Sequence, residues 1–128
     1  MGSKYLLDSN IAVYLMNGTL KGDEHPDLVS AIQDVPCISV ISRMELLGWT
    51  PPTEEEADQI RDFVNHAIEY NLTEDIILRT IEIRKSKRIK LPDAIIAATA
   101  LSNDLILLTR NTSDFKGIPD LICVNPVP

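Results

Sequence analysis

The feature that most constrains this chain is an almost uninterrupted apolar stretch at residues 94–101, with the sequence AIIAATAL. The only charged residue between Leu91 and Asn103 is Asp93. Pro92 stands where the first turn of a helix accepts proline, so the stretch is predicted to be helical. A helix that is apolar on nearly all sides is stable only when other elements cover it. We therefore expect this helix to be buried in the core.

Short apolar runs alternate with helical patterns along the rest of the chain. The expected strands are residues 4–7, 37–40, 105–108 and 121–124. The expected helices begin near residues 11, 23, 41, 53, 73 and 91. This alternation is typical of an α/β fold with a mainly parallel sheet.

The longest expected helix begins at Thr53, because Thr53-Glu54-Glu55-Glu56 has the pattern of a capping box. Its apolar stripe runs through residues 57, 60, 64, 67 and 68, close to the helical period of about 3.6. A break follows at residues 71–73, and Thr73 is expected to cap the next helix.

Size and composition are those of one globular domain. The chain has 128 residues, of which 45% are hydrophobic and 24% charged, values that exclude a disordered chain. No apolar run approaches the about 20 residues of a membrane span and no signal peptide opens the chain, so we expect a cytoplasmic protein without membrane contact. Residues 1–3 resemble an expression scar, and residues 1–128 are expected to form a single domain.

Cys37 and Cys123 lack CxxC spacing, which predicts two reduced thiols and no disulfide.

The charge is unevenly distributed. The net charge of −7, from 19 acids against 12 bases, argues against a simple coat for duplex DNA. Half of the bases fall within residues 79–90: they are Arg79, Arg84, Lys85, Lys87, Arg88 and Lys90. The four at positions 84, 85, 87 and 88 are candidate nucleic-acid-binding residues. The cluster is either a solvated helix end, where cations are favourable, or a patch that faces phosphates.

Four carboxylates occupy positions where each has a structural and a functional interpretation. Asp8 ends the first strand and either caps a helix or faces a ligand. Asp114 follows the strand at 105–108 and otherwise closes an Asx turn. Asp93 begins the buried helix, where an acid also suits the helix dipole. Glu45 shares a helical face with Ile41 and is otherwise an exposed helix residue.

These four acids are expected to meet at one edge of the sheet, because ligands bind beyond the carboxyl ends of parallel strands. Carboxylates that converge repel one another unless a cation lies among them. A set of oxygen ligands without Cys or His selects Mg²⁺ or Mn²⁺. Such ions in an acidic cleft most often handle phosphates, so the residues themselves predict metal-dependent phosphoryl chemistry.

Four segments together resemble the PIN-domain nucleases, and most closely the VapC-type toxins of bacterial toxin–antitoxin pairs. They are KYLLDSN at residues 4–10, ISVISRMEL at 38–46, LPDAIIAA at 91–98 and LTRNTSDF at 108–115. They occur in the family's order and spacing and span essentially the whole chain. The resemblance implies a three-layer α/β/α fold with a central parallel sheet of about five strands.

The resemblance also implies roles for residues. Asp8 and Asp93 match the main Mg²⁺ (or Mn²⁺) ligands, and Glu45 matches the acid that completes the shell or orients water. Asn10, beside the first acid, and Thr109 match residues that support the site. The family's usual fourth acid falls at Asn111, so the catalytic set is expected to be completed by another carboxylate, Asp114.

The implied reaction is hydrolysis of an RNA phosphodiester, and the implied partners are a cognate antitoxin and a second copy of the chain. Met44, Leu47 and Trp49 are candidates for a contact patch between copies. Tyr14 and Trp49 either stack on a base or pack in a core or interface.

Three alternatives stay open. A catalytically weakened PIN-like module that only binds RNA or an antitoxin is favoured by Asn111. A phosphoacceptor signalling domain uses adjacent acids and a basic residue after a late strand, for which Arg110 is a poor substitute. A phosphatase of the haloacid-dehalogenase type has a second Asp at the position of Asn10.

Overall fold

The computed structural model describes residues 4–21, 25–33 and 35–127. The suspected expression scar at residues 1–3 and the first two residues of the helix expected at 23–33 lie outside the described part. Within that part, no helix is both long and apolar enough to cross a membrane.

The described strands form one sheet in which every pairing is parallel. The strands are β1 (Tyr5–Leu7), β2 (Cys37–Ser39), β3 (Ile68–Tyr70), β4 (Ile106–Leu108) and β5 (Cys123–Val124). Their order is β3-β2-β1-β4-β5, so β1 is central, with Leu6 opposite both Cys37 and Leu107. The expected α/β class with a parallel sheet of five strands is confirmed.

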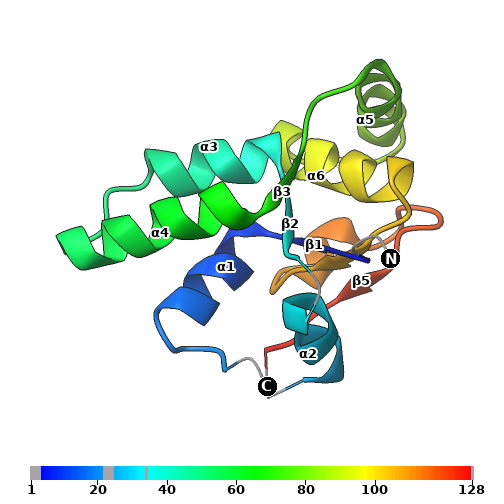
Figure 1. The fold of residues 1–128 in the computed structure, drawn as a ribbon. Coiled ribbons are helices and arrows are strands. Elements are labelled where there is room, and N and C mark those ends of the chain that lie inside the picture. The colour runs from blue at the N-terminus through cyan, green and yellow to red at the C-terminus, as the bar shows by residue number, and fades with distance from the viewer. Residues whose placement is uncertain (1–3, 22–24, 34, 128) are drawn as a thin grey trace.

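Helices cover both faces of this sheet (Figure 1). The helices are α1 (Ser9–Met16), α2 (Pro26–Gln33), α3 (Val40–Gly48), α4 (Glu54–His66), α5 (Glu74–Ser86) and α6 (Leu91–Ser102), with a short 3₁₀ helix at Thr112–Phe115. α5 and α6 lie on one face, and α1 and α2 lie on the other. α3 and α4 pack against α1 through Ala12, Leu46 and Ile60.

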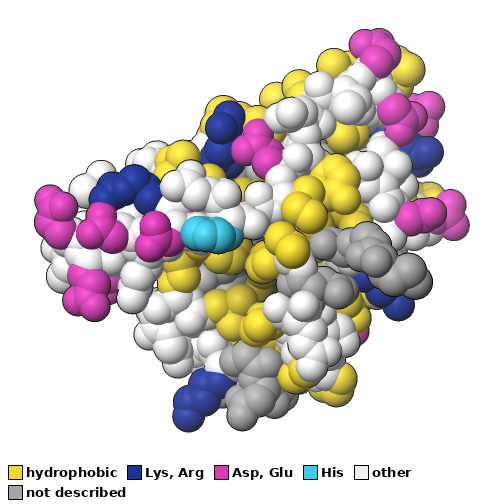
Figure 2. All heavy atoms as spheres, viewed as in Figure 1, with side chains coloured by type: hydrophobic (Ala, Val, Ile, Leu, Met, Phe, Trp, Pro, Cys, Tyr) yellow, Lys and Arg dark blue, Asp and Glu magenta, His cyan; other side chains and the backbone are white. Residues whose placement is uncertain are grey.

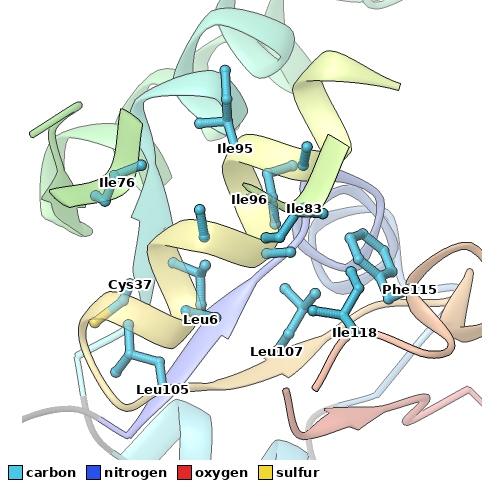
Figure 3. Packing of buried hydrophobic residues seen from close by; sticks show 14 residues of the cluster. Leu6, Cys37, Ile76, Ile83, Ile95, Ile96, Leu105, Leu107, Phe115 and Ile118 are labelled. Carbon is cyan, nitrogen blue, oxygen red and sulfur yellow. The ribbon is translucent and has the colours of Figure 1, made fainter. Parts of the chain in front are cut away.

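The core has two main layers, one on each face of the sheet. Successive residues of a strand point to opposite faces, so Leu6 packs with Leu107 and α6 (Figure 3), whereas Tyr5 and Leu7 pack with Ile11 of α1. All seven residues from Ala94 to Ala100 are buried. The prediction that this apolar helix lies inside the protein is confirmed.

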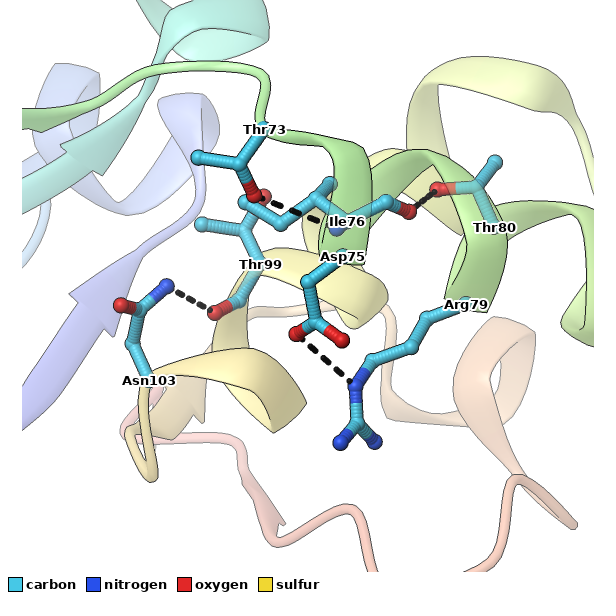
Figure 4. A network of polar contacts seen from close by, with 7 residues as sticks. All are labelled: Thr73, Asp75, Ile76, Arg79, Thr80, Thr99 and Asn103. Atoms are coloured by element: carbon cyan, nitrogen blue, oxygen red, sulfur yellow. Dashed lines mark hydrogen bonds and ion pairs between the residues drawn. The ribbon is translucent and has the colours of Figure 1, made fainter.

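The far end of the α5–α6 pair is fixed by polar contacts (Figure 4). Thr73 caps α5, since its hydroxyl oxygen accepts a hydrogen bond of 3.2 Å from the Ile76 N–H. Asp75 and Arg79 form an ion pair of 3.3 Å one turn later. Asn103 closes the end of α6 by donating to the Thr99 carbonyl at 2.9 Å. The opposite end of the pair is the short connection at residues 87–90, which lies beside the candidate site.

One expected element is wrong at its end. The long helix ends at His66, and Ile68, assigned above to its apolar stripe, belongs to the edge strand β3. The Ile68 N–H donates to the Pro36 carbonyl at 2.8 Å. β3 is short, and Ile68 is 42% exposed. The alternation Ile68-Glu69-Tyr70 covers only three residues, which is too short to indicate a strand, and Ile68 lies four residues after Val64, as a helical stripe requires.

The two cysteines are free. Cys37 lies in β2 and Cys123 in β5, with β1 and β4 between them. Neighbouring strands are about 4.8 Å apart, and β2 and β5 are separated by three such spacings. The Cα atoms of the two cysteines are therefore about 14 Å apart or more. A disulfide needs Cα atoms within about 7 Å, and the predicted absence of a disulfide agrees with this arrangement.

Leu107→Ala is expected to lower the free energy of unfolding by about 2–5 kcal/mol, because it leaves a cavity between the sheet and α6. The matched control is Leu78→Ala on α5, where the side chain is 53% exposed and the expected change is within about 0.5 kcal/mol. Urea unfolding followed by circular dichroism measures both. Equal losses for the two variants would contradict the assigned core.

Candidate active site

Asp8 is the most constrained carboxylate of the described chain. It directly follows β1, and its backbone N–H donates to the Leu108 carbonyl of β4 at 2.9 Å. Its side chain is buried, with the residue only 7% exposed. Oδ1 accepts from the Ser9 N–H at 2.8 Å, and Oδ2 accepts from the Thr109 hydroxyl at 2.8 Å. Asp8 therefore caps α1 and faces the site at once, so its two sequence interpretations are compatible.

Thr109 connects Asp8 to the segment that follows β4. It is fully buried, and its hydroxyl oxygen also accepts a hydrogen bond of 3.1 Å from the Asn111 N–H. The hydroxyl thus donates to one partner and accepts from another, which leaves it a single orientation.

Glu45 reaches the site from the exposed side of α3. Its Oε1 accepts a hydrogen bond of 3.0 Å from the Ser9 hydroxyl. Burial raises the pKa of Glu45, the bond from Ser9 lowers it, and the negative charges of Asp8 and Asp93 raise it again. Glu45 is therefore not an independent surface residue: it belongs electrostatically to the same group as Asp8.

Asp93 and Asp114 come from the segments on the other side of Asp8. Asp93 lies in the first turn of α6, and Asp114 lies in the 3₁₀ helix. Burial raises the pKa of Asp93, the charges of Asp8 and Asp114 raise it further, and Lys90 lowers it. Burial likewise raises the pKa of Asp8; the bonds from Thr109 and Ser9 lower it, and the charge of Asp114 adds to the increase. All four carboxylates thus lie within electrostatic range at one edge of the sheet.

The turn before Asp114 is closed by the backbone. The Asp114 N–H donates to the Asn111 carbonyl at 3.0 Å. Within the described residues the carboxylate of Asp114 accepts no hydrogen bond from the protein, so an Asx turn does not account for it. Asn111 precedes this 3₁₀ helix without capping it through its side chain.

The donors of the site match a divalent cation in kind but not in arrangement. No three described His, Cys, Asp or Glu side chains are close enough to form a ready metal-binding group. The donors are nevertheless all oxygens, and none of the four acids forms an ion pair with a described Lys or Arg. Asn10 adds a buried Oδ1 without a hydrogen-bond partner in the described protein. One buried and three more accessible carboxylates that repel one another suit a hard cation and its water, so the residues fit the ion although they do not enclose it.

The basic cluster is divided by the structure. Arg84, Lys87 and Arg88 line a cleft of about 570 Å³ together with Asp93 and Asp114. Lys85 lines only the adjoining hollow along α5. The sequence places all four cations close together along the chain. It does not show which side chains face the acids, because neighbouring residues at a helix end project in different directions.

Two further residues were not identified as site residues from the sequence. Lys90 acts on Asp93, and its position three residues before that acid was the available signal. Arg110 lies over the Tyr14 ring, 5.6 Å from its centroid, and hydrogen-bonds to its hydroxyl. No local pattern predicts this contact, since the two residues are 96 positions apart.

The buried charge of Asp8 is expected to cost stability in the metal-free protein. Its pKa is raised in the folded state, so its contribution is favourable below the unfolded pKa of about 3.9 and is lost as pH rises through the folded value. Asp8→Asn should therefore raise the thermal midpoint at pH 7 in EDTA, and the difference should vanish near pH 4. Asp62→Asn on the exposed side of α4 is the control, and it should leave the thermal midpoint unchanged at both pH values. A lower midpoint for Asp8→Asn at pH 7 would contradict the electrostatic interpretation.

Comparison with known proteins places this geometry in a family. Residues 5–121 match the PIN domain. No curated protein sequence matches the chain. Among solved structures, a toxin–antitoxin complex from Klebsiella pneumoniae is similar with 33% identity and a TM-score of 0.73, covering 96% of this chain and 98% of that one.

Two other structures share the fold. VapBC-1 from nontypeable Haemophilus influenzae is 25% identical, with a TM-score of 0.72 and coverage of 97% of this chain and 98% of that one. DNA-bound VapBC from Salmonella typhimurium is 21% identical, with a TM-score of 0.79 and the same coverages of 97% and 98%. The family match spans nearly the whole chain and contains all four acids, and the chain belongs to the PIN domain family.

Proposed function

We propose that the chain is a VapC-type toxin, an endoribonuclease that cleaves RNA phosphodiesters with the help of Mg²⁺ or Mn²⁺. The observation that carries the proposal is the group of four mutually repelling acids at the carboxyl edge of the sheet in a PIN domain. PIN domains are generally nucleases, and a relative with 33% identity comes from a toxin–antitoxin complex. The proposal treats residues 1–128 as one catalytic domain that acts in the cytoplasm.

The proposed metal ligands are Asp8, Asp93 and Glu45, with Asp114 as the fourth catalytic carboxylate. When bound there, a divalent cation supplies an acidified water and neutralises charge on the phosphate. Asn10, Thr109 and Asn111 are assigned supporting roles. Of these, Thr109 has the clearest basis, because its hydroxyl holds the Asp8 carboxylate at 2.8 Å.

Glu45 has one oxygen left for the reaction. Ser9 holds Oε1, which leaves Oε2 either to complete the metal shell or to orient the attacking water. Asp8 is more buried and has both oxygens occupied, so it suits a fixed ligand rather than a base.

The proposed partners are a cognate antitoxin and a second copy of the chain. Met44, Leu47 and Trp49 are 56%, 50% and 45% exposed, so α3 and its end present three large apolar side chains to the surface. We assign this strip to the contact between copies. Light scattering at micromolar concentration should give the mass of a dimer, and Leu47→Asp should give a monomer that retains its circular dichroism. A monomeric wild type would contradict the assignment.

Asp93→Asn is expected to reduce RNA cleavage by at least about 100-fold, since losses of even indirect metal partners cost about 10–100-fold. The substrate is a labelled single-stranded RNA with Mg²⁺ or Mn²⁺, and EDTA should abolish cleavage by the wild type. Asp62→Asn is the matched control and should cleave normally. Calorimetric binding of Mg²⁺ without any cleavage by the wild type would favour the alternative, a PIN-like module that only binds RNA or an antitoxin.

Asp114→Asn and Asn111→Asp decide which residue completes the acidic set. Asp114 acts electrostatically on Asp8 and Asp93, so its loss is expected to weaken both Mg²⁺ binding and cleavage. Asn111→Asp should then have the smaller effect. If Asp114→Asn leaves both quantities unchanged while Asn111→Asp raises both, the assignment of Asp114 is wrong.

A further inference from the structure

We infer that the cleft between the α5–α6 connection and the acids binds the phosphates next to the bond that is cut, through Arg84, Lys87 and Arg88. This inference rests on the proposed function, because it assigns a path to the RNA strand at the same site. Lys90 also lines this cleft, beside Asp93, whereas Lys85 does not, and the arrangement gives the substrate a path that leads away from the acids.

The cleft joins cations and acids in one space. Its volume is about 570 Å³, with Arg84, Lys87 and Arg88 in its lining together with Asp93 and Asp114. A second hollow of about 710 Å³ shares the same three cations and continues along α5 as far as Thr80. The two hollows therefore make a continuous trough that begins at the acids and runs along α5.

None of the three cations Arg84, Lys87 and Arg88 forms an ion pair with a described acid. The Lys and Arg ion pairs of the described residues lie outside the trough. They join Arg43 to Glu69, Arg61 to Asp58 and Arg79 to Asp75. Arg84 instead donates from Nε to the Ile89 carbonyl at 3.4 Å, which ties the guanidinium to the connection. Ile89 in turn packs against the core, so the connection that carries Lys87 and Arg88 is anchored.

Helix electrostatics explain only part of the cluster. Arg84 and Lys85 lie in the last turn of α5, where cations are favourable. Lys87 and Arg88 lie beyond that turn, and Lys90 is the N-cap of α6, where a positive charge is unfavourable. Asp93 offsets part of the charge of Lys90, since the two attract each other without forming an ion pair. Lys87 and Arg88 remain without compensation, an arrangement that an external anion would stabilise.

An RNA strand is the anion that fits both ends of the trough. With a net charge of −7 and four acids at the site, the chain repels phosphates except where cations lie within about 8 Å, the screening length at physiological salt. On the face shown in Figure 2, Lys and Arg side chains lie singly rather than in a cluster. The hollow on the opposite side of the acids, which includes Tyr14, Glu45 and Trp49, is lined by no Lys or Arg. Asp8 is buried, so a flexible single strand approaches it more closely than a duplex does.

The test measures binding, not cleavage. A fluorescent, unstructured oligoribonucleotide is titrated with the full chain in EDTA, and the dissociation constant is followed by anisotropy over a series of KCl concentrations. Each phosphate contact of a single strand contributes about 0.7 to the slope of log affinity against log salt. Lys87→Ala/Arg88→Ala is therefore expected to weaken binding and to lower the slope by about 1.4.

The matched control removes the same charge elsewhere. Lys21→Ala/Arg61→Ala changes the net charge equally at exposed positions outside the trough and should leave the slope unchanged. Thermal midpoints equal to that of the wild type show that all variants are folded. Equal slopes for the two double variants would overturn the inference, as would tight binding of polyglutamate in place of RNA.

The two proposals fail separately. Cleavage by the wild type with unaltered slopes rejects the trough and leaves the nuclease proposal standing. A slope that depends on Lys87 and Arg88, without cleavage in Mg²⁺ or Mn²⁺, supports the trough and rejects the nuclease.

Discussion

The arrangement of the site depends on one buried carboxylate, that of Asp8, and on the hydrogen bonds that hold it. The Ser9 N–H binds one oxygen and the Thr109 hydroxyl binds the other. These donors belong to the ends of β1 and β4, which pair in register along their whole length. A charge that is removed from water is tolerated only when it is hydrogen-bonded, so the position of Asp8 and the pairing of the two strands require each other.

The apolar core serves the site by fixing the elements around Asp8. α6 is buried along seven consecutive residues, so its first turn, with Asp93, has little freedom to move. Caps and ion pairs fix the far end of the α5–α6 pair and leave the near end for charged residues (Figure 4). Packing of the apolar side chains thus positions the acids, although these side chains take no part in the chemistry of the site.

The charges of the chain are separated rather than mixed. Acids occupy the edge of the sheet, and uncompensated cations occupy the adjoining trough. Neither group is favourable for the isolated protein: burial, and then the like charges nearby, raise the pKa of Asp8, Glu45 and Asp93, and Lys90 at the N-cap of α6 opposes the helix dipole. The two proposed ligands, a cation at the acids and phosphates in the trough, would each relieve one of these costs. Perturbed pKa values and uncompensated charges of this kind are typical of functional sites.

The sequence by itself determined the features that depend on near neighbours. The apolar run at 94–101 required a buried helix, Thr53 and Thr73 marked helix starts, and four short motifs indicated a PIN domain. The tertiary structure alone decided that Ile68 joins an edge strand, that Ser9 bridges to Glu45, and which cations share a cleft with the acids. The physical reason is distance along the chain. Periodicity and capping act within a few residues, whereas the bond between Ser9 and Glu45 spans 36 positions and that between Thr109 and Asp8 spans 101. Contacts of that range exist only after the sheet has brought its strand ends together.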